Sequence, residues 1–222
     1  MSDITAGGTP APLPAPVQPE AGAPGAPSVR TDVPAPGVAP APVEPDGRAL
    51  ALASEHPACV FLPGTPEYDA GRVAWNLAID QRPVAVARPR NPEELAEVVR
   101  AAGRQGLRIA PQGTGHGAGP MAGRDLSGVV LARLDAWRTV TVDPEARTAR
   151  AAAGALWRDV VEAAAPYGLA ALHGSSHDVG VAGYTLGGGL SFYARRHGLA
   201  TNHLVSAEIG RASCRERVSF LV

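Results

Sequence analysis

The chain has 222 residues, a formal net charge of −1 and 45% hydrophobic residues, a composition typical of a globular protein of one domain or slightly more. Without a basic excess, this charge argues against a nucleic-acid groove. Cys59 and Cys214 are the two cysteines and indicate no disulfide framework. The sequence has neither a signal-peptide pattern nor an apolar run of the ~20 residues that span a bilayer. We therefore expect a cytoplasmic protein that does not contact membranes.

Residues 1–47 consist mostly of Ala, Pro, Gly and Val, and hold more than half of the chain's 22 prolines. Proline fixes φ and removes a backbone donor, so neither a helix nor a sheet ladder runs through such a stretch. Large apolar side chains are nearly absent, so burial cannot offset the entropy of ordering. We expect a disordered or polyproline-II tail here.

Order is expected to begin near Asp46, which can cap a short helix over residues 47–53. The Thr65-Pro66-Glu67 sequence indicates a second helix, because threonine caps and proline suits the first helical position.

A β-α-β unit follows. Residues 83–87 form an apolar run typical of a buried strand. Asn91 and the next residue, a proline, begin the best-signalled helix, and Gly106 ends it before a strand at 107–110. The two strands of such a unit are expected to be parallel.

In the second half of the chain, the predicted strands and helices alternate less regularly. A strand is expected at 129–132, a hairpin at 139–142 and 148–152, a helix at 155–165 and a last strand at 204–209. The side chains of the 155–165 helix expected to face inward are Leu156, Trp157, Val160, Val161 and Ala164.

Two glycine-rich stretches, 111–119 and 175–189, could carry chemistry. Dense glycines let the backbone approach a ligand closely and turn N–H groups toward it, which suits a pyrophosphate. A flexible surface turn explains one such loop about equally well. Two long loops fit a long, multi-part cofactor better than a single phosphate.

Other site types fit these residues less well. Gly113-x-Gly115-x-x-Ala118, with Asp135 downstream, matches a nicotinamide-dinucleotide fingerprint, but the fingerprint needs a helix inside the motif. Residues 117–123 disfavour such a helix, because each glycine lowers helix stability by ~1 kcal/mol and an interior proline by ~3 kcal/mol.

The adjacent Ser176-His177-Asp178 is no hydrolase triad, because triad residues converge from distant positions. His173 and His177 have a metal-ligand spacing only on a helix, which the intervening Gly-Ser-Ser disfavours. We expect no metal site.

Residues 75–209 resemble the FAD-binding domain of the vanillyl-alcohol oxidase / p-cresol methylhydroxylase (PCMH) family, most closely its berberine-bridge-enzyme-like oxidases. The similar segments follow the family's order and spacing. They are Trp75-Asn76, Arg82-Pro83, 86–94, the Gly-Thr-Gly-His loop 113–116, 142–149, 153–157 and 179–189.

The resemblance implies an α+β, PCMH-type FAD-binding domain of two sub-domains, truncated, with FAD extended between them. It implies that His116 bonds covalently to the 8α carbon of the flavin. Ser176 stands where some members carry a second, cysteine tether, so no second tether is expected. The cofactor-binding residues implied are Gln112, Gly113, Thr114, Gly115, His116, Gly117, Ser176, Val179, Gly180, Gly183, Gly187 and Gly188.

We divide the chain into a tail at 1–47, an incomplete FAD-binding domain at 48–209, and residues 210–222. The last segment begins with a charged Gly-Arg-Ala-Ser-Cys-Arg-Glu-Arg string that resembles a translated sequencing adapter. We expect it to be non-native, and we expect the strand pattern to end at Ile209.

The function expected is that of an FAD-dependent oxidoreductase that takes a hydride from an alcohol, sugar or amine carbon of a small-molecule substrate. The catalytic residues belong to a part of the family's sequence that is absent here, so they stay unknown. The alternative is a non-catalytic flavin-binding or interaction fragment. The truncated chain itself is expected to be inactive.

Overall fold

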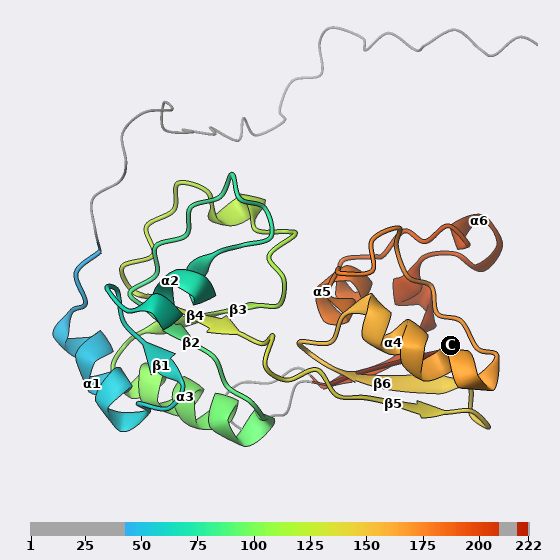
Figure 1. Ribbon diagram of the computed structural model, residues 1–222, viewed down its shortest axis with the longest axis horizontal. Coiled ribbons are helices and arrows are strands. Elements are labelled where there is room, and N and C mark those ends of the chain that lie inside the picture. The colour runs from blue at the N-terminus through green and yellow to red at the C-terminus, as the bar shows by residue number, and fades with distance from the viewer. Residues whose placement is uncertain (1–42, 209–216, 222) are drawn as a thin grey trace, which may run out of the picture. The chain divides into compact units, whose positions relative to one another are not determined.

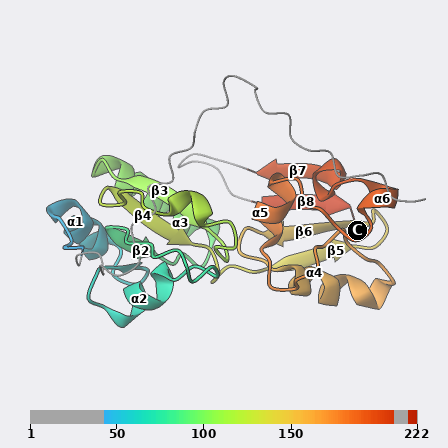
Figure 2. The same ribbon diagram turned by 90° about the horizontal axis from the view of Figure 1, so that it is seen from above.

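The computed structural model describes residues 43–208 and 217–221, which belong to one compact unit of the chain. Most of the predicted tail, and all of the charged string except its last residue, Arg217, lie outside the described residues. The described chain forms two four-stranded sheets with helices packed against them, as the ribbon diagrams show (Figures 1 and 2).

The first sheet has the strand order β1-β2-β4-β3. Its three parallel strands are β2 (Ala85–Ala87), β4 (Val129–Arg133) and β3 (Arg108–Gln112), and β1 (Val60–Phe61) pairs antiparallel with β2. The predicted β-α-β strands are indeed parallel, but β4 lies between them. Crossover connections allow this insertion, which periodicity along one segment cannot reveal.

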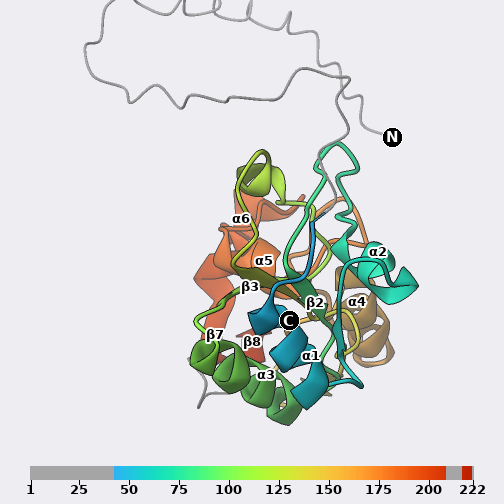
Figure 3. The same ribbon diagram turned by 90° about the vertical axis from the view of Figure 1, so that its left-hand side faces the viewer.

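Helices cover both faces of this sheet (Figure 3). Helices α1 (Gly47–Glu55) and α3 (Pro92–Arg104) pack against one face, and α2 (Pro66–Arg72) against the other. Alternation along β2 makes this possible: Ala85 and Ala87 face α1 and α3, whereas Val86 faces α2.

The three predicted helix caps of this half are confirmed. Asp46 accepts hydrogen bonds from the backbone N–H groups two and three residues on, at 3.0 and 2.9 Å. Thr65 accepts one at 3.2 Å and Asn91 one at 2.8 Å. Each satisfies a donor that the first helical turn leaves unpaired.

The second sheet is antiparallel, with the order β5-β6-β8-β7 (Figure 2). Its strands are β5 (Val140–Asp143), β6 (Thr148–Ala152), β8 (Arg217–Leu221) and β7 (Leu204–Glu208). The predicted hairpin is confirmed as β5 and β6. Strand β8 was not expected, because the strand pattern was predicted to end at Ile209. Strand β8 pairs with the edge of β6 through main-chain hydrogen bonds, and such pairing does not require an alternating side-chain pattern in the sequence. Whether residues 210–222 are native stays a prediction.

Helices α4 (Trp157–Ala164) and α5 (Val181–Leu186) share a hydrophobic core with β6. Trp157 and Val160 are buried as predicted, but Val161 is 39% exposed, so its assignment to the core is wrong. At 100° per residue Val161 lies at the rim of the buried face of this two-turn helix.

The remaining short elements are α6 (Ala194–His197) and the 3₁₀ turns η1 (Gly119–Met121), η2 (Ala165–Tyr167) and η3 (Ala200–His203). Among the described residues, the structure contains no helix with the length and apolar character needed to cross a bilayer.

Candidate cofactor site

Residues 112–117 of the first glycine-rich stretch are the predicted cofactor residues, and we call them the first glycine segment. This segment begins where β3 ends. Gly115 has φ +83°, and a Cβ there would lie 2.9 Å from both Cα and Cβ of Ala74. Only glycine accepts this conformation and this approach without strain. The neighbouring Trp75 backbone N–H donates to the Thr114 carbonyl at 2.9 Å, so the segment is fixed against the chain that follows α2.

Gln112 turns into the protein rather than toward the loop. Its amide exchanges hydrogen bonds with that of Gln81, at 2.8 and 3.1 Å, and its oxygen also accepts from Arg133 at 3.1 Å. Gln81 is fully buried and Arg133 is 8% exposed; burial lowers the pKa of the Arg133 guanidinium. This buried polar network anchors the base of the segment.

The second glycine stretch was expected to be a continuous loop. It is not, because α5 begins within it. The Val179 carbonyl accepts the Trp157 N–H at 3.0 Å, and Gly180 forms an antiparallel bridge with Leu156. These contacts fix the stretch to the start of α4. A Cβ at Gly180 would lie 3.9 Å from the Thr114 methyl carbon, so the two glycine segments meet there.

The His116 imidazole lies at this junction. It stacks on the Trp75 indole, with ring centroids 3.9 Å apart and planes 16° apart. Its Nδ1 is 2.8 Å from Thr114 Oγ1, and its Nε2 is 3.7 Å from Asp178 Oδ1. Asp178 also accepts the Trp75 indole N–H at 2.9 Å and the Ser176 hydroxyl. We call Trp75, His116, Ser176 and Asp178 the junction cluster.

Several glycines of the two segments face open space. At Gly117, and at Gly183 apart from the backbone of its own helix, no atom of the described chain other than those of the adjacent residues lies within 4 Å of where a Cβ would stand. Gly113 is nearly as open, with only a backbone oxygen at 3.9 Å. Packing within the described residues therefore does not require glycine here, whereas a closely approaching ligand would.

One buried polar atom of the second stretch also fits a ligand. The hydroxyl of Thr185 on α5 has no hydrogen-bond partner within the described part of the chain, whereas His116 Nε2 faces the Asp178 carboxylate at 3.7 Å. Buried polar atoms are normally hydrogen-bonded, so such atoms indicate a missing partner. The residues present thus fit a polar, extended cofactor.

Gly187 and Gly188 are placed differently from the rest. Gly187 caps α5, and its N–H bonds to the Gly183 carbonyl at 3.0 Å. Gly188 has φ +108°, and its carbonyl accepts the Thr201 N–H of η3 at 3.0 Å. Both therefore end the helix, in addition to any contact with a ligand.

Sequence reasoning gave no site role to Trp75, Asp178, Gln81 or Arg133. An available signal was Arg133, a charged residue that ends an otherwise apolar strand. Asp178 was judged only as a possible triad member. Its contact with Trp75 joins positions 103 residues apart, which no local pattern reveals.

The structure disfavours the rival interpretations on the residues it describes. The first glycine segment leads into a three-residue 3₁₀ turn, η1, rather than an α-helix. Asp135, the acidic residue of the nicotinamide fingerprint, forms an ion pair with Arg88 at 3.0 Å. His173 and His177 lie on a non-helical segment, as predicted.

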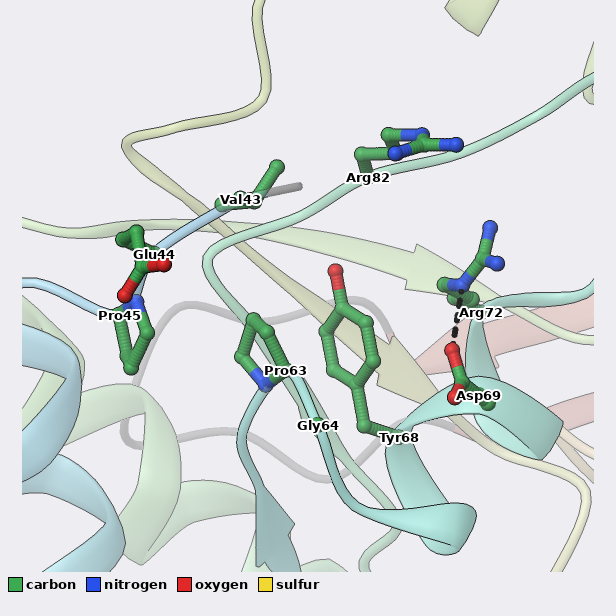
Figure 4. Close-up of a pocket in the computed structure, with 9 residues that line it drawn as sticks. All are labelled: Val43, Glu44, Pro45, Pro63, Gly64, Tyr68, Asp69, Arg72 and Arg82. Carbon is green, nitrogen blue, oxygen red and sulfur yellow. Dashed lines mark hydrogen bonds and ion pairs between the residues drawn. The ribbon is translucent and has the colours of Figure 1, made fainter. Parts of the chain in front are cut away.

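A pocket of about 260 Å³ lies elsewhere, between the chain before α1 and helix α2 (Figure 4). No predicted site residue lines it. Its Arg72 pairs with Asp69 and Asp80, and the Tyr68 hydroxyl donates to a backbone carbonyl at 2.7 Å. Because these polar groups already have partners within the protein, we place the cofactor site at the glycine segments instead.

The family model for an FAD binding domain matches residues 83–213, more than half of the chain. The chain belongs to this family, which confirms the resemblance drawn from its sequence. The match includes both glycine segments and the strand β4 between β2 and β3.

Two curated relatives are similar over most of the described chain. (R)-6-hydroxynicotine oxidase of Paenarthrobacter nicotinovorans is 32% identical over 154 residues, which are 69% of this chain and 33% of that protein. Glucooligosaccharide oxidase of Sarocladium strictum is 31% identical over 142 residues, 64% of this chain and 28% of that protein. The chain thus spans about a third of the length of these relatives.

Solved structures share the fold. One is glucooligosaccharide oxidase from Acremonium strictum, which carries a 6-S-cysteinyl, 8α-N1-histidyl FAD. It aligns with a TM-score of 0.67 and 25% identity over 79% of this chain and 42% of that chain. Physcomitrella patens BBE-like 1 aligns with a TM-score of 0.67 and 24% identity, over 79% of this chain and 44% of that chain. The expected α+β, PCMH-type fold is confirmed.

Proposed function

We propose that this chain is the FAD-binding part of an FAD-linked oxidoreductase. The observation that supports this function best is the junction of the two glycine segments, where His116 lies next to the open Gly117, together with the unpartnered buried hydroxyl of Thr185 on α5. Bound FAD would accept a hydride from an alcohol, sugar or amine carbon. The protein's own residues would bind and orient it.

We further propose that His116 holds the flavin covalently. Its neutral imidazole is a competent nucleophile near pH 7. A ring nitrogen would replace one hydrogen of the flavin's 8α carbon, forming a C–N bond. The two electrons and two protons released would go to dioxygen, giving hydrogen peroxide. A relative with a histidyl-linked FAD supports this assignment.

Ser176 supports a single tether. The relative just named carries a cysteinyl as well as a histidyl bond. At the matching position this chain has a hydroxyl, which is a far weaker nucleophile than a thiolate. The Ser176 hydroxyl is moreover engaged with Asp178.

Acid denaturation tests both statements. The full chain, supplied with FAD and then precipitated in acid, is expected to retain yellow colour in the pellet. His116→Ala is expected to release the flavin into the supernatant without loss of the far-UV circular dichroism of the fold. Colour that leaves the wild-type pellet entirely would refute the covalent link. Flavin that stays with denatured His116→Ala would refute the single tether.

The chain by itself is expected to bind flavin without turning over substrate, since it spans about a third of the relatives' length. Reduction of an artificial electron acceptor, with alcohols, amines and oligosaccharides as substrates, measures this. The alternative function, a non-catalytic flavin-binding fragment, predicts the same result for this chain, but it also predicts no turnover by the product of the complete reading frame. Turnover by this 222-residue chain would contradict the proposed inactivity.

A further inference from the structure

Asp178 lies at the centre of the junction cluster, and the proposed function gives it no role. One carboxylate oxygen accepts the Trp75 indole N–H at 2.9 Å. The other accepts the Ser176 hydroxyl and lies 3.7 Å from His116 Nε2. This 3.7 Å separation is longer than a hydrogen bond, so the carboxylate acts on the imidazole through its negative charge.

The Asp178 side chain is charged at neutral pH. The Ser176 hydroxyl, and after it the Trp75 N–H, lower the pKa of this carboxyl below its ordinary value of 3.8, because both donate to the ionised form. His116 therefore faces a fixed negative charge from the second glycine stretch.

The His116 ring is restrained on three sides. The Trp75 indole covers one face, the Thr114 hydroxyl is 2.8 Å from Nδ1, and Asp178 faces Nε2. A hydroxyl can donate or accept, whereas a carboxylate only accepts. The proton of the neutral ring is therefore stabilised on Nε2, and the Nδ1 lone pair can accept from Thr114. The opposite tautomer would direct the Nε2 lone pair at a negative oxygen.

We propose that Asp178 is a positioning residue that fixes His116 as its Nε2–H tautomer and thereby keeps the lone pair on Nδ1, where the cofactor would take the place of the Thr114 hydroxyl. Trp75 holds the ring plane and, through its N–H, the carboxylate. This inference rests on the proposed function, since the flavin is what Nδ1 would meet. The tautomer itself exists without the flavin and can be measured alone.

Nitrogen NMR of the flavin-free chain, labelled with ¹⁵N in histidine, tests the tautomer. The two ring nitrogens differ in chemical shift according to which carries the proton, and His116→Gln assigns the signals. We expect a protonated Nε2 in the wild type at neutral pH. In Asp178→Asn, we expect both shifts to move toward the average of the two tautomers. Unchanged shifts in Asp178→Asn would overturn the proposal.

The rate of covalent flavin attachment gives a second readout. FAD is mixed with the flavin-free chain, samples are quenched in acid, and flavin fluorescence is measured on the denatured protein. We expect Asp178→Asn to slow attachment by about tenfold or more, as expected when an oriented partner of a reacting histidine is removed. Trp75→Phe keeps an aromatic face but loses the N–H donor, so we expect a smaller slowing.

Asp143→Asn is the matched control. It removes the same charge at the end of β5, where the Asp143 side chain accepts hydrogen bonds from two nearby backbone N–H groups. Its attachment rate is expected to equal that of the wild type. Asp178→Glu, which restores a carboxylate, is expected to recover part of the rate.

The outcomes separate the two claims. Equal attachment by wild type and Asp178→Asn would overturn the role of Asp178 and leave the proposed function standing. A wild type that attaches no flavin would refute the covalent link, and the NMR comparison would still decide the tautomer. If circular dichroism shows that Asp178→Asn is unfolded, Trp75→Phe and Asp178→Glu decide the question. The proposal would be overturned if Trp75→Phe had the attachment rate and the His116 chemical shifts of the wild type and if Asp178→Glu attached no flavin.

Discussion

Gly115 and Gly117 of the first glycine segment are chemically identical but differ in their surroundings. Gly115 is required by the backbone, because its φ is +83° and a side chain would meet Ala74. Gly117, two residues on, is exposed and faces open space. The fold therefore does not require glycine at position 117, whereas a cofactor that approaches the backbone there would.

Alanine at each of these glycines separates fold from binding. Gly115→Ala is expected to lower the free energy of unfolding by about 2 kcal/mol, from a disfavoured backbone conformation and a steric overlap. Gly117→Ala is expected to change it by less than about 0.5 kcal/mol. It is nevertheless expected to weaken FAD binding about tenfold, because a methyl group would block the backbone's approach to the cofactor.

Urea denaturation measures the stabilities, and quenching of flavin fluorescence measures the affinity. Unchanged affinity in a stable Gly117→Ala protein would show that the cofactor does not approach this residue.

At the scale of elements, the chain that connects the two sheets contains one very close backbone contact. A Cβ at Gly154, between β6 and α4, would lie 1.8 Å from the Leu134 carbonyl oxygen and 2.6 Å from that of Trp137. The Gly154 N–H donates to the Trp137 carbonyl at 3.1 Å. Backbone atoms cannot yield as a flexible side chain can, so the chain segments after β4 and after β6 can pack this closely only with glycine.

Gly154→Ala is expected to lower the free energy of unfolding by about 3 kcal/mol, at the upper end of overpacking effects. Gly103→Ala is the matched control, since Gly103 lies on the exposed side of α3 with open space around it. There alanine is expected to raise stability by up to about 1 kcal/mol, because it favours the helix. Thermal or urea unfolding of the two variants provides the comparison. A Gly154→Ala protein as stable as the wild type would show that this contact is looser than described.

At the scale of the whole described chain, the junction cluster brings together three segments. One follows α2, one follows β3 and one precedes α5. Trp75 and His116 belong to the half with the first sheet, and Ser176 and Asp178 to the half with the second. A site built from both halves forms only when both have folded. We therefore expect flavin binding to report on the folding of the whole unit rather than of either sheet.

The same scale shows an uneven distribution of apolar surface. Residues 186–205 expose six large apolar side chains, among them Leu190 at 74% and Phe192 at 77%.

Local chemistry in the sequence determined much of this protein. The caps at Asp46, Thr65 and Asn91, the β5–β6 hairpin and the parallel strands of the first sheet all follow from patterns within a few residues. The resemblance of the glycine segments to a flavin-binding family also followed from the sequence, since motif order and spacing are written there.

Tertiary structure alone decided the rest. The insertion of β4 between β2 and β3, the pairing of β8 and the short helix α5 depend on which backbone edges and faces meet. The side-chain amide of Gln112 bonds to Gln81 and Arg133, and the predicted contact of Gln112 with the cofactor stays a prediction. Asp178 reaches His116 and Trp75 across 62 and 103 residues. Such contacts are fixed by packing in three dimensions, and sequence patterns extend only along the chain.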